Sequence, residues 1–203
     1  MNIIRVIQVG LGPVGQMLTP FLMERKFLSI VGAVDINPKI VGQDLGDVCG
    51  LGKRTGIVVR ESMESFSEES AEVAVVTTTS KLNGIFPTLE SAAKLGLDVV
   101  STCEELVYPW NTQPELSRRI NTLAKDHEVS FLGTGVNPGF LMDAFAVTAT
   151  GISRDVKKIQ IERIQDASKR RIPFQRKIGT MLTVDEFRKK VAAGNLGHVG
   201  LTE

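Results

Sequence analysis

Residues 3–15, IIRVIQVGLGPVG, form an apolar run rich in β-branched residues that ends in the glycine spacing GxGxxG. A second apolar run, LSIVGAVD, ends at Asp35, 20 residues after the last of the three glycines. In this context Gly10 permits a tight turn, Gly12 lets the backbone approach a pyrophosphate, and Gly15 lets a helix pack on the strand. The N-terminus of that helix attracts phosphate groups. The stretch therefore predicts a strand, a turn and a helix that bind a dinucleotide.

The position of Asp35 bears on the choice of cofactor. An acidic side chain at the end of the second strand is expected to accept hydrogen bonds from the adenosine ribose hydroxyls, which favours NAD. Lys39, four residues further on, leaves NADP open. The residues expected to contact the cofactor are Gly10, Gly12, Pro13, Val14, Gly15, Asp35, Thr77, Thr78, Thr79, Cys103 and Asn137.

Short runs rich in β-branched residues alternate with helix-length segments, as is typical of a parallel sheet covered on both faces. The runs span residues 3–9, 28–35, 73–79, 98–104 and 129–135, and a helix is expected over 113–126. We therefore predict an α/β fold over residues 1–150, with a Rossmann-type doubly wound parallel sheet.

The pattern changes after residue 150. VKKIQIERIQD, residues 156–166, partly alternates, which suits a strand of an antiparallel or mixed sheet. In TVDEFRKKVAAG, Thr183 and Glu186 have the spacing of a capping box, and Gly194 can end the helix. Residues 151–203 are therefore expected to begin an α+β domain for substrate binding and oligomerisation. No later element completes its sheet, so we expect this domain to be incomplete.

The charges of the chain nearly cancel, because 24 basic residues face 23 acidic ones and the net charge is +1. Such a chain has no broad field to attract nucleic acid or an anionic membrane, so a small molecule is the expected partner. No apolar run approaches the ~20 residues that span a bilayer, and the N-terminus does not resemble a signal peptide, so we expect a cytoplasmic protein. The two cysteines and two histidines lack metal-site spacing, and no metal is expected.

Residues 101–110, STCEELVYPW, place two adjacent carboxylates just after an apolar run. Ligands of open α/β sheets bind beyond the carboxyl ends of the strands, where Thr77–Thr79 are also expected. Either Glu104 or Glu105 could take a proton from an amine or a water there, with Tyr108 and Trp110 close by. The alternatives are that the acidic pair is simply solvated and that the threonines only finish a strand.

Residues 133–143, GTGVNPGFLMD, predict a bend that leads into the second domain and lines the ligand site. The basic stretch 168–177 could bind a carboxylate through Arg170, Arg171 or Arg176, or could be a solvated loop. His198 is a third candidate for a catalytic residue, although a lone histidine can equally be structural.

Five stretches together resemble the 2,4-diaminopentanoate dehydrogenases and the related native amine dehydrogenases, an extended branch of the dihydrodipicolinate reductase type. They are VGLGPVGQ, VDINPKIVGQDLGDV, STCEELVYPW, GTGVNPGFLMD and GHVGL. Members of the family extend well beyond the equivalent of residue 203. The paired histidines and the Pro-Ser-Gly-Thr of true dihydrodipicolinate reductases are absent where IERIQDASKRRIPFQRKIGT stands, which argues against the lysine-pathway reaction.

The resemblance implies reversible, NAD(P)-linked oxidative deamination of an amine or diamino acid, typically 2,4-diaminopentanoate. A family glutamate in CEEL handles the amine and water, and we favour Glu104 over Glu105 because it lies nearer the strand end. The residues expected to contact the substrate are Tyr108, Trp110, Asn137, Pro138, Gly139 and Arg163. A homo-oligomer, namely a dimer, is expected. The rival hypotheses are reduction of a cyclic C=N bond and a non-catalytic NAD-binding regulator.

Overall fold

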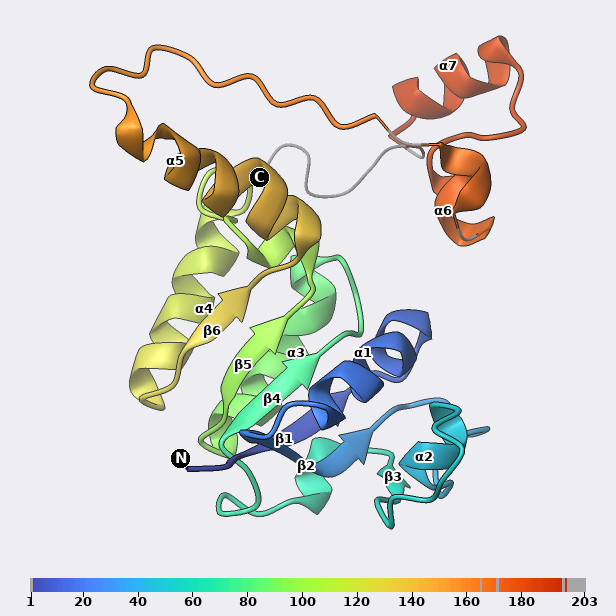
Figure 1. The fold of residues 1–203 in the computed structure, drawn as a ribbon, viewed down its shortest axis with the longest axis vertical. Coiled ribbons are helices and arrows are strands. Elements are labelled where there is room, and N and C mark those ends of the chain that lie inside the picture. The colour runs from blue at the N-terminus through green and yellow to red at the C-terminus, as the bar shows by residue number, and fades with distance from the viewer. Residues whose placement is uncertain (1, 165, 171, 195, 197–203) are drawn as a thin grey trace.

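The computed structural model describes residues 2–164, 166–170, 172–194 and 196. Its centre is a sheet of six parallel strands in the order β3-β2-β1-β4-β5-β6 (Figure 1). The strands are β1 (Ile4–Val9), β2 (Leu28–Val34), β3 (Val59–Arg60), β4 (Val73–Val76), β5 (Asp98–Ser101) and β6 (Phe131–Gly133). The strand order reverses between β1 and β4, which defines the topological switch point of a doubly wound sheet. The predicted α/β fold is confirmed.

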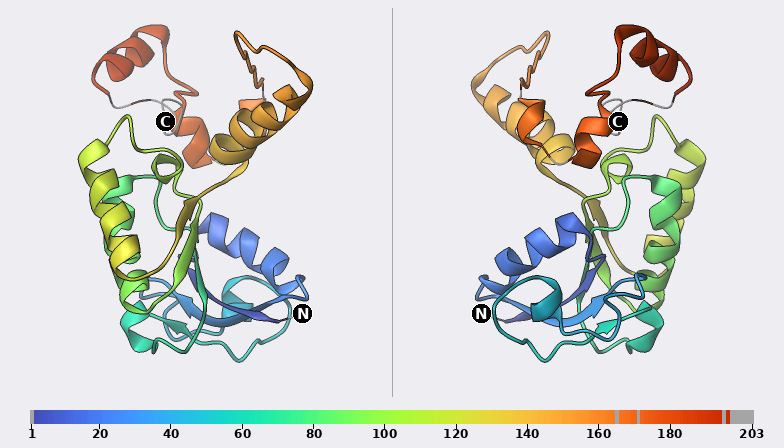
Figure 2. Two further views of the ribbon diagram at one scale, coloured as in Figure 1. Left: turned by 90° about the vertical axis from the view of Figure 1, so that its left-hand side faces the viewer. Right: turned by 90° about the vertical axis from the view of Figure 1, so that its right-hand side faces the viewer.

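Helices cover the sheet from both sides (Figure 2). Helices α3 (Leu82–Lys94) and α4 (Pro114–Asp126) lie side by side on one face, and α1 (Pro13–Met23) lies on the other. Ile7, Val76 and Val99 from three neighbouring strands pack with Leu89 of α3, and each is at most 1% exposed. Burying one such side chain contributes about 1.5–3 kcal/mol, so this layer is a main source of the stability of the fold.

Proline marks the start of two of these helices. Pro13 and Pro114 occupy the first helical positions of α1 and α4, where the missing N–H has no intrahelical partner in any case. Helix α1 continues through Pro20. Helix α4 confirms the helix predicted over 113–126 and turns Ser117 and Ile120 into the protein.

Several strands end earlier than the sequence predicted, most clearly β4 and β5. Strand β4 ends at Val76, before the three threonines, and β5 ends at Ser101, so that the two glutamates lie in the short 3-10 helix η2 (Glu104–Leu106). Strand β3, helix α3, the short helix α2 (Leu45–Val48) and the 3-10 helix η1 (Met63–Ser65) were not predicted. These segments have weak periodicity or few residues.

The prediction of a strand over 156–166 was wrong. Residues 156–164 are exposed and follow no regular secondary structure, and none of the described strands pairs with them. Alternation of apolar and polar residues indicates only that two faces differ, whereas a strand also needs a neighbour for its backbone hydrogen bonds.

The remaining elements connect the sheet to the C-terminal helices. The segment η3 (Val136–Ala144), whose backbone is not helical at residues 137–139, leads into α5 (Phe145–Ala149) and the 3-10 turn η4 (Thr150–Ile152). The 3-10 turn η5 (Ala167–Lys169), α6 (Ile172–Lys177) and α7 (Val184–Ala192) follow. Thr183 and Glu186 form the predicted capping box of α7, and Gly194 has the positive φ of +68° expected after a helix. Within the described ranges, none of the helices has the length and apolar character needed to cross a bilayer.

Candidate functional site

The three glycines between β1 and α1 differ in what surrounds them. Gly10 has a φ of +88°, and a Cβ there would lie 2.9 Å from the backbone carbonyl carbon of Thr77. A Cβ on Gly15 would lie 2.0 Å from the carbonyl oxygen of Gly10. By contrast, a Cβ on Gly12 would meet no atom within 4 Å. Gly10 and Gly15 are therefore required by the fold itself, whereas the absent side chain of Gly12 leaves open space at the helix N-terminus.

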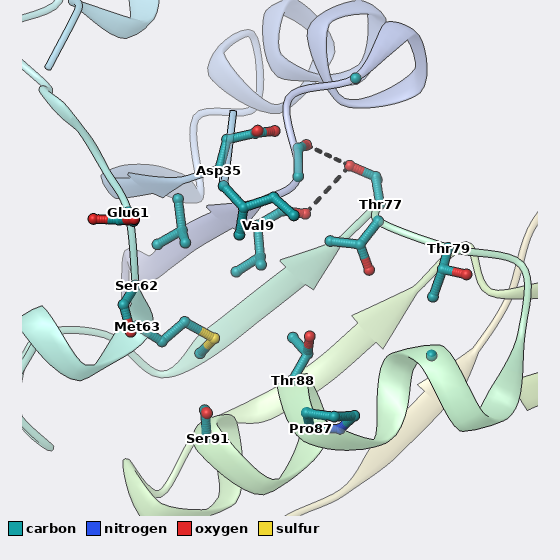
Figure 3. A pocket seen from close by; sticks show the side chains of 16 residues that line it. Val9, Asp35, Glu61, Ser62, Met63, Thr77, Thr79, Pro87, Thr88 and Ser91 are labelled. Carbon is teal, nitrogen blue, oxygen red and sulfur yellow. Dashed lines mark hydrogen bonds between the residues drawn. The ribbon is translucent and has the colours of Figure 1, made fainter. Parts of the chain in front are cut away.

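Thr77 holds the glycine loop against the neighbouring strand. Its hydroxyl Oγ1 donates to the carbonyl of Gly10 at 2.6 Å (Figure 3). The same oxygen accepts a hydrogen bond from the side-chain amide of Gln8 at 3.1 Å. Its backbone N–H donates to the carbonyl of Val9 at 2.8 Å. The hydroxyl of Thr77 thus faces the glycine loop.

A cavity of about 550 Å³ opens at the switch point of the sheet (Figure 3). The ends of β1, β2 and β4 form one side of it, and Pro87 and Thr88 of α3 lie on the other. Six of the predicted cofactor residues line this cavity, namely Gly10, Gly12, Asp35, Thr77, Thr78 and Thr79. Pro13 and Val14 begin α1 next to it, and Gly15 packs against the glycine loop. The position and size of the cavity suit the adenosine and pyrophosphate half of a dinucleotide.

The carboxylate of Asp35 is fixed by two backbone groups. Oδ2 accepts a hydrogen bond from the N–H of Leu11 at 2.6 Å, and Oδ1 accepts one from the N–H of Asn37 at 2.8 Å. Each oxygen keeps a further lone pair for another donor. Asp35 is therefore held beside the glycine loop, where it can accept hydrogen bonds from a ribose.

Glu61 lines the same cavity and was missed by sequence reasoning. It follows the two-residue strand β3, and the backbone N–H of Asp35 donates to the carbonyl of Arg60 at 3.0 Å, which brings the two strand ends together. A strand of two residues carries no periodic signal in the sequence. The charged residues that line the cavity are Asp35 and Glu61, and both are negative.

The adjacent glutamates of η2 have different surroundings. Glu105 is only 8% exposed, and its carboxylate accepts hydrogen bonds from Lys81 Nζ at 2.6 Å, the N–H of Leu82 at 2.8 Å and Gln113 Nε2 at 2.9 Å. Burial raises the pKa of Glu105, but the hydrogen bonds outweigh it and the pKa lies below its usual value. A carboxylate with three donors and a lowered pKa is a poor proton acceptor. Glu104, which is partly exposed, is the better candidate for a base.

Three other candidate residues lie outside the cavity. Cys103 is fully buried, and its thiol, whose pKa burial raises to about 12, belongs to the hydrophobic core. Tyr108 and Trp110 are 52% and 45% exposed.

The predicted bend at 133–143 is present. The peptide bond between Asn137 and Pro138 is cis, Gly139 has a φ of +122°, and its N–H donates to Asp143 Oδ2 at 2.6 Å. The bend lies beyond β6, and Asn137 does not line the cavity. Arg163 lies in the exposed stretch 156–164, and His198 lies outside the described residues.

Comparison with known proteins finds similarity to amine dehydrogenases. The family model of the 2,4-diaminopentanoate dehydrogenase C-terminal domain matches residues 140–203. The 2,4-diaminopentanoate dehydrogenase of Acetoanaerobium sticklandii is 33% identical over 206 residues, which cover 100% of this chain and 58% of that protein. The chain is related to the 2,4-diaminopentanoate dehydrogenases. The resemblance seen in the sequence is thereby confirmed.

Two further proteins are similar to the chain. The structure of an amine dehydrogenase from Mycobacterium smegmatis superposes with a TM-score of 0.76 and 28% identity, over 97% of this chain and 58% of that one. A 4-hydroxy-tetrahydrodipicolinate reductase from Mastigocladus laminosus is 22% identical over 172 residues, which cover 80% of this chain and 59% of that protein. The chain thus spans less than two thirds of the length of each of these relatives.

Proposed function

We propose that residues 1–150 form the dinucleotide-binding domain of an NAD-dependent amine dehydrogenase, and that residues 151–203 begin its substrate and oligomerisation domain. The observation that carries this proposal is the cavity at the switch point, where Gly12 leaves the helix N-terminus open and Asp35 is fixed beside it. The reaction class is supported by the similarity of the chain to a 2,4-diaminopentanoate dehydrogenase and an amine dehydrogenase.

The charges around the cavity favour NAD over NADP. A 2′-phosphate, with a charge of about −1.5 to −2, would face both Asp35 and Glu61. The guanidinium of Arg60 lies 4.3 Å from the centre of the Phe66 ring and donates to the carbonyl of Ser65, so it is held by η1 and its surroundings. The guanidinium of Arg60, which is the cationic group closest in sequence to Glu61, is therefore already engaged in other contacts.

For the chemistry, we propose that Glu104 removes a proton from the substrate ammonium. The neutral amine then has a lone pair that stabilises the adjacent carbon as hydride leaves it. NAD, when bound, supplies the hydride acceptor. Water adds to the resulting imine, and the products are a carbonyl compound and ammonia. For 2,4-diaminopentanoate the carbonyl product is 2-amino-4-oxopentanoate.

Because Glu104 lies on η2, next to the loop 77–81, it can reach the carboxyl end of the sheet where the nicotinamide half would lie.

An assay of the intact protein with a panel of amines and diamino acids tests the proposal. Reduction of NAD with an amine, and release of ammonia in equal amount, is the expected result. Activity only with a cyclic imine would instead indicate a reductase like the Mastigocladus laminosus relative, and binding of NAD without turnover would indicate a regulator. Analytical ultracentrifugation of the same sample tests the expected dimer.

A further inference from the structure

The structure contains a buried carboxylate that the proposed chemistry does not use. Glu105 receives its three hydrogen bonds from three places in the chain, namely Lys81 before α3, Leu82 at the first position of α3, and Gln113 before α4. Its own backbone N–H donates to the carbonyl of Ser80 at 3.2 Å. Both the side chain and the backbone of Glu105 therefore bind the residues that precede α3.

One of these contacts replaces the side-chain cap that α3 lacks. Neither Lys81 nor Gln113, the N-cap residues of α3 and α4, makes a capping hydrogen bond with its own side chain. Glu105 accepts from the first amide of α3 and places a negative charge at the positive end of that helix. The side chain of Gln113 binds the same carboxylate. One carboxylate thus ties η2 to the starts of both helices.

The residues around Glu104 are consequently held in place. Cys103 and Leu106 are buried at 0% and 7% exposure, and Glu105 is anchored between them. Successive side chains of a 3-10 helix point about 120° apart, since the helix has 3 residues per turn. With Glu105 turned toward α3 and α4, the side chain of Glu104 must point elsewhere, and it is partly exposed.

We propose that Glu105 is a positioning residue, which fixes η2 so that the carboxylate of Glu104 is held in one place at the carboxyl end of the sheet. The catalytic consequence rests on the proposed function of Glu104. The anchoring of η2 rests on the contacts of Glu105 alone. The two parts can therefore be measured separately.

Turnover of the single and double variants Glu104→Gln and Glu105→Gln in the intact protein tests the catalytic part. Misplacing a catalytic group by about 1 Å can lower the rate by as much as about 100-fold, so Glu105→Gln should lower kcat by about 10-fold to 100-fold. The affinity for NAD should stay within about twofold, because Glu105 does not line the cavity. If Glu105 acts through Glu104, the double variant should have the kcat of Glu104→Gln, since nothing remains to be positioned.

Glu72→Gln is the matched control. Glu72 also accepts a backbone N–H and a cation, because Arg5 donates to it through its N–H at 2.6 Å and its Nε at 2.9 Å. It precedes β4 and lies at the opposite end of that strand from the threonines. The Glu72 variant should therefore unfold at a lower temperature with unchanged kcat. Lys81→Met provides a second way to disturb Glu105 if the Gln variant folds poorly, because it removes one of the three donors.

Amide hydrogen exchange tests the anchoring without any assay of activity. The N–H of Leu82 and the amides of residues 103–107 should exchange faster in Glu105→Ala than in the wild type, while those of β1 and β4 keep their protection. Unchanged exchange at these amides overturns the proposal whatever the protein catalyses. The catalytic part is overturned if Glu105→Gln has the kcat of the wild type. It is also overturned if Glu105→Gln lowers kcat by the same factor in the Glu104→Gln variant as in the wild type. No turnover of any amine by the wild type contradicts the proposed function, and the exchange result then stands alone.

Discussion

Gly12→Val should weaken NAD binding and leave the fold intact. The backbone of Gly12 has φ −66° and ψ −175°, which a residue with a side chain can adopt, and a Cβ there meets no protein atom within 4 Å. The side chain of valine would therefore occupy only the space in front of the helix N-terminus, where we place the pyrophosphate. Forcing extra atoms into such a packed contact typically costs about 1–3 kcal/mol, which raises the Kd for NAD by about 5-fold to 150-fold.

Gly15→Ala serves as the contrasting variant. Its Cβ would lie 2.0 Å from the carbonyl oxygen of Gly10 and 2.8 Å from Oγ1 of Thr77, so the backbone of the loop has to move. Overpacking should therefore destabilise the folded state by about 1–3 kcal/mol. For a chain of this size, the Tm should then drop by about 2–12 °C. Gly12→Val, as a substitution into open space, should change the Tm by about 2 °C or less.

Isothermal titration calorimetry and thermal unfolding of the three proteins measure both effects. Gly12→Val should bind NAD more weakly at a nearly unchanged Tm, and Gly15→Ala should have a lower Tm. An NAD affinity unchanged by Gly12→Val would show that the pyrophosphate does not lie over this loop. An equal loss of Tm in both variants would show that Gly12 is also required by the fold.

Three more outcomes are expected. Asp35→Ser should shift the preference from NAD toward NADP, and adding Glu61→Gln should shift it further, because each change removes a negative charge from the cavity; Kd values for both nucleotides measure this. Glu104→Gln keeps the shape of the side chain and removes the base, so steady-state turnover should fall by about 100-fold or more while the Kd for NAD hardly changes. The hydrogen bond from the N–H of Thr55, with further bonds from Gly46 and Gly56, lowers the pKa of Asp44 to about 2, against about 3.8 when unfolded. This stabilisation is present above pH ~4 and is lost as the pH falls toward ~2. Asp44→Asn should therefore be less stable than the wild type at pH 7, and its free energy of unfolding in urea should decrease less than that of the wild type between pH ~4 and ~2.

The places of the glycine loop and of Asp35 in the fold could be predicted from the sequence because their pattern is local. A strand, a turn and a helix follow one another within residues 3–23, and Gly10 and Gly15 each have a specific steric reason. The same local reasoning found α4 and the capping box of α7. Such elements are encoded in the order of neighbouring residues, which a single sequence displays directly.

Features that depend on distant residues could not be found in this way. Glu61 reaches the cavity because β3 pairs with β2, and the two-residue strand has no recognisable pattern. The partners of Glu105 lie 24 residues before it, at Lys81, and eight after it, at Gln113. Only the packing of α3 and α4 side by side brings these residues together. The failed prediction at 156–166 has the same origin, because pairing with another strand is not a property of the segment itself.

The juxtaposition of two glutamates also has a physical explanation. A general base needs free lone pairs to take a proton, but it must also stay within ~3 Å of the atom that releases it. A carboxylate with many donors is held firmly, yet those donors lower its pKa and make it a weaker base, as they do in Glu105. A carboxylate with few donors is the stronger base, but its position is less defined. Adjacent glutamates on one 3-10 turn can divide these requirements, because Glu105 takes the fixing contacts and Glu104 keeps its lone pairs. On this argument Glu105→Gln should impair the geometry of the site, and Glu104→Gln its chemistry.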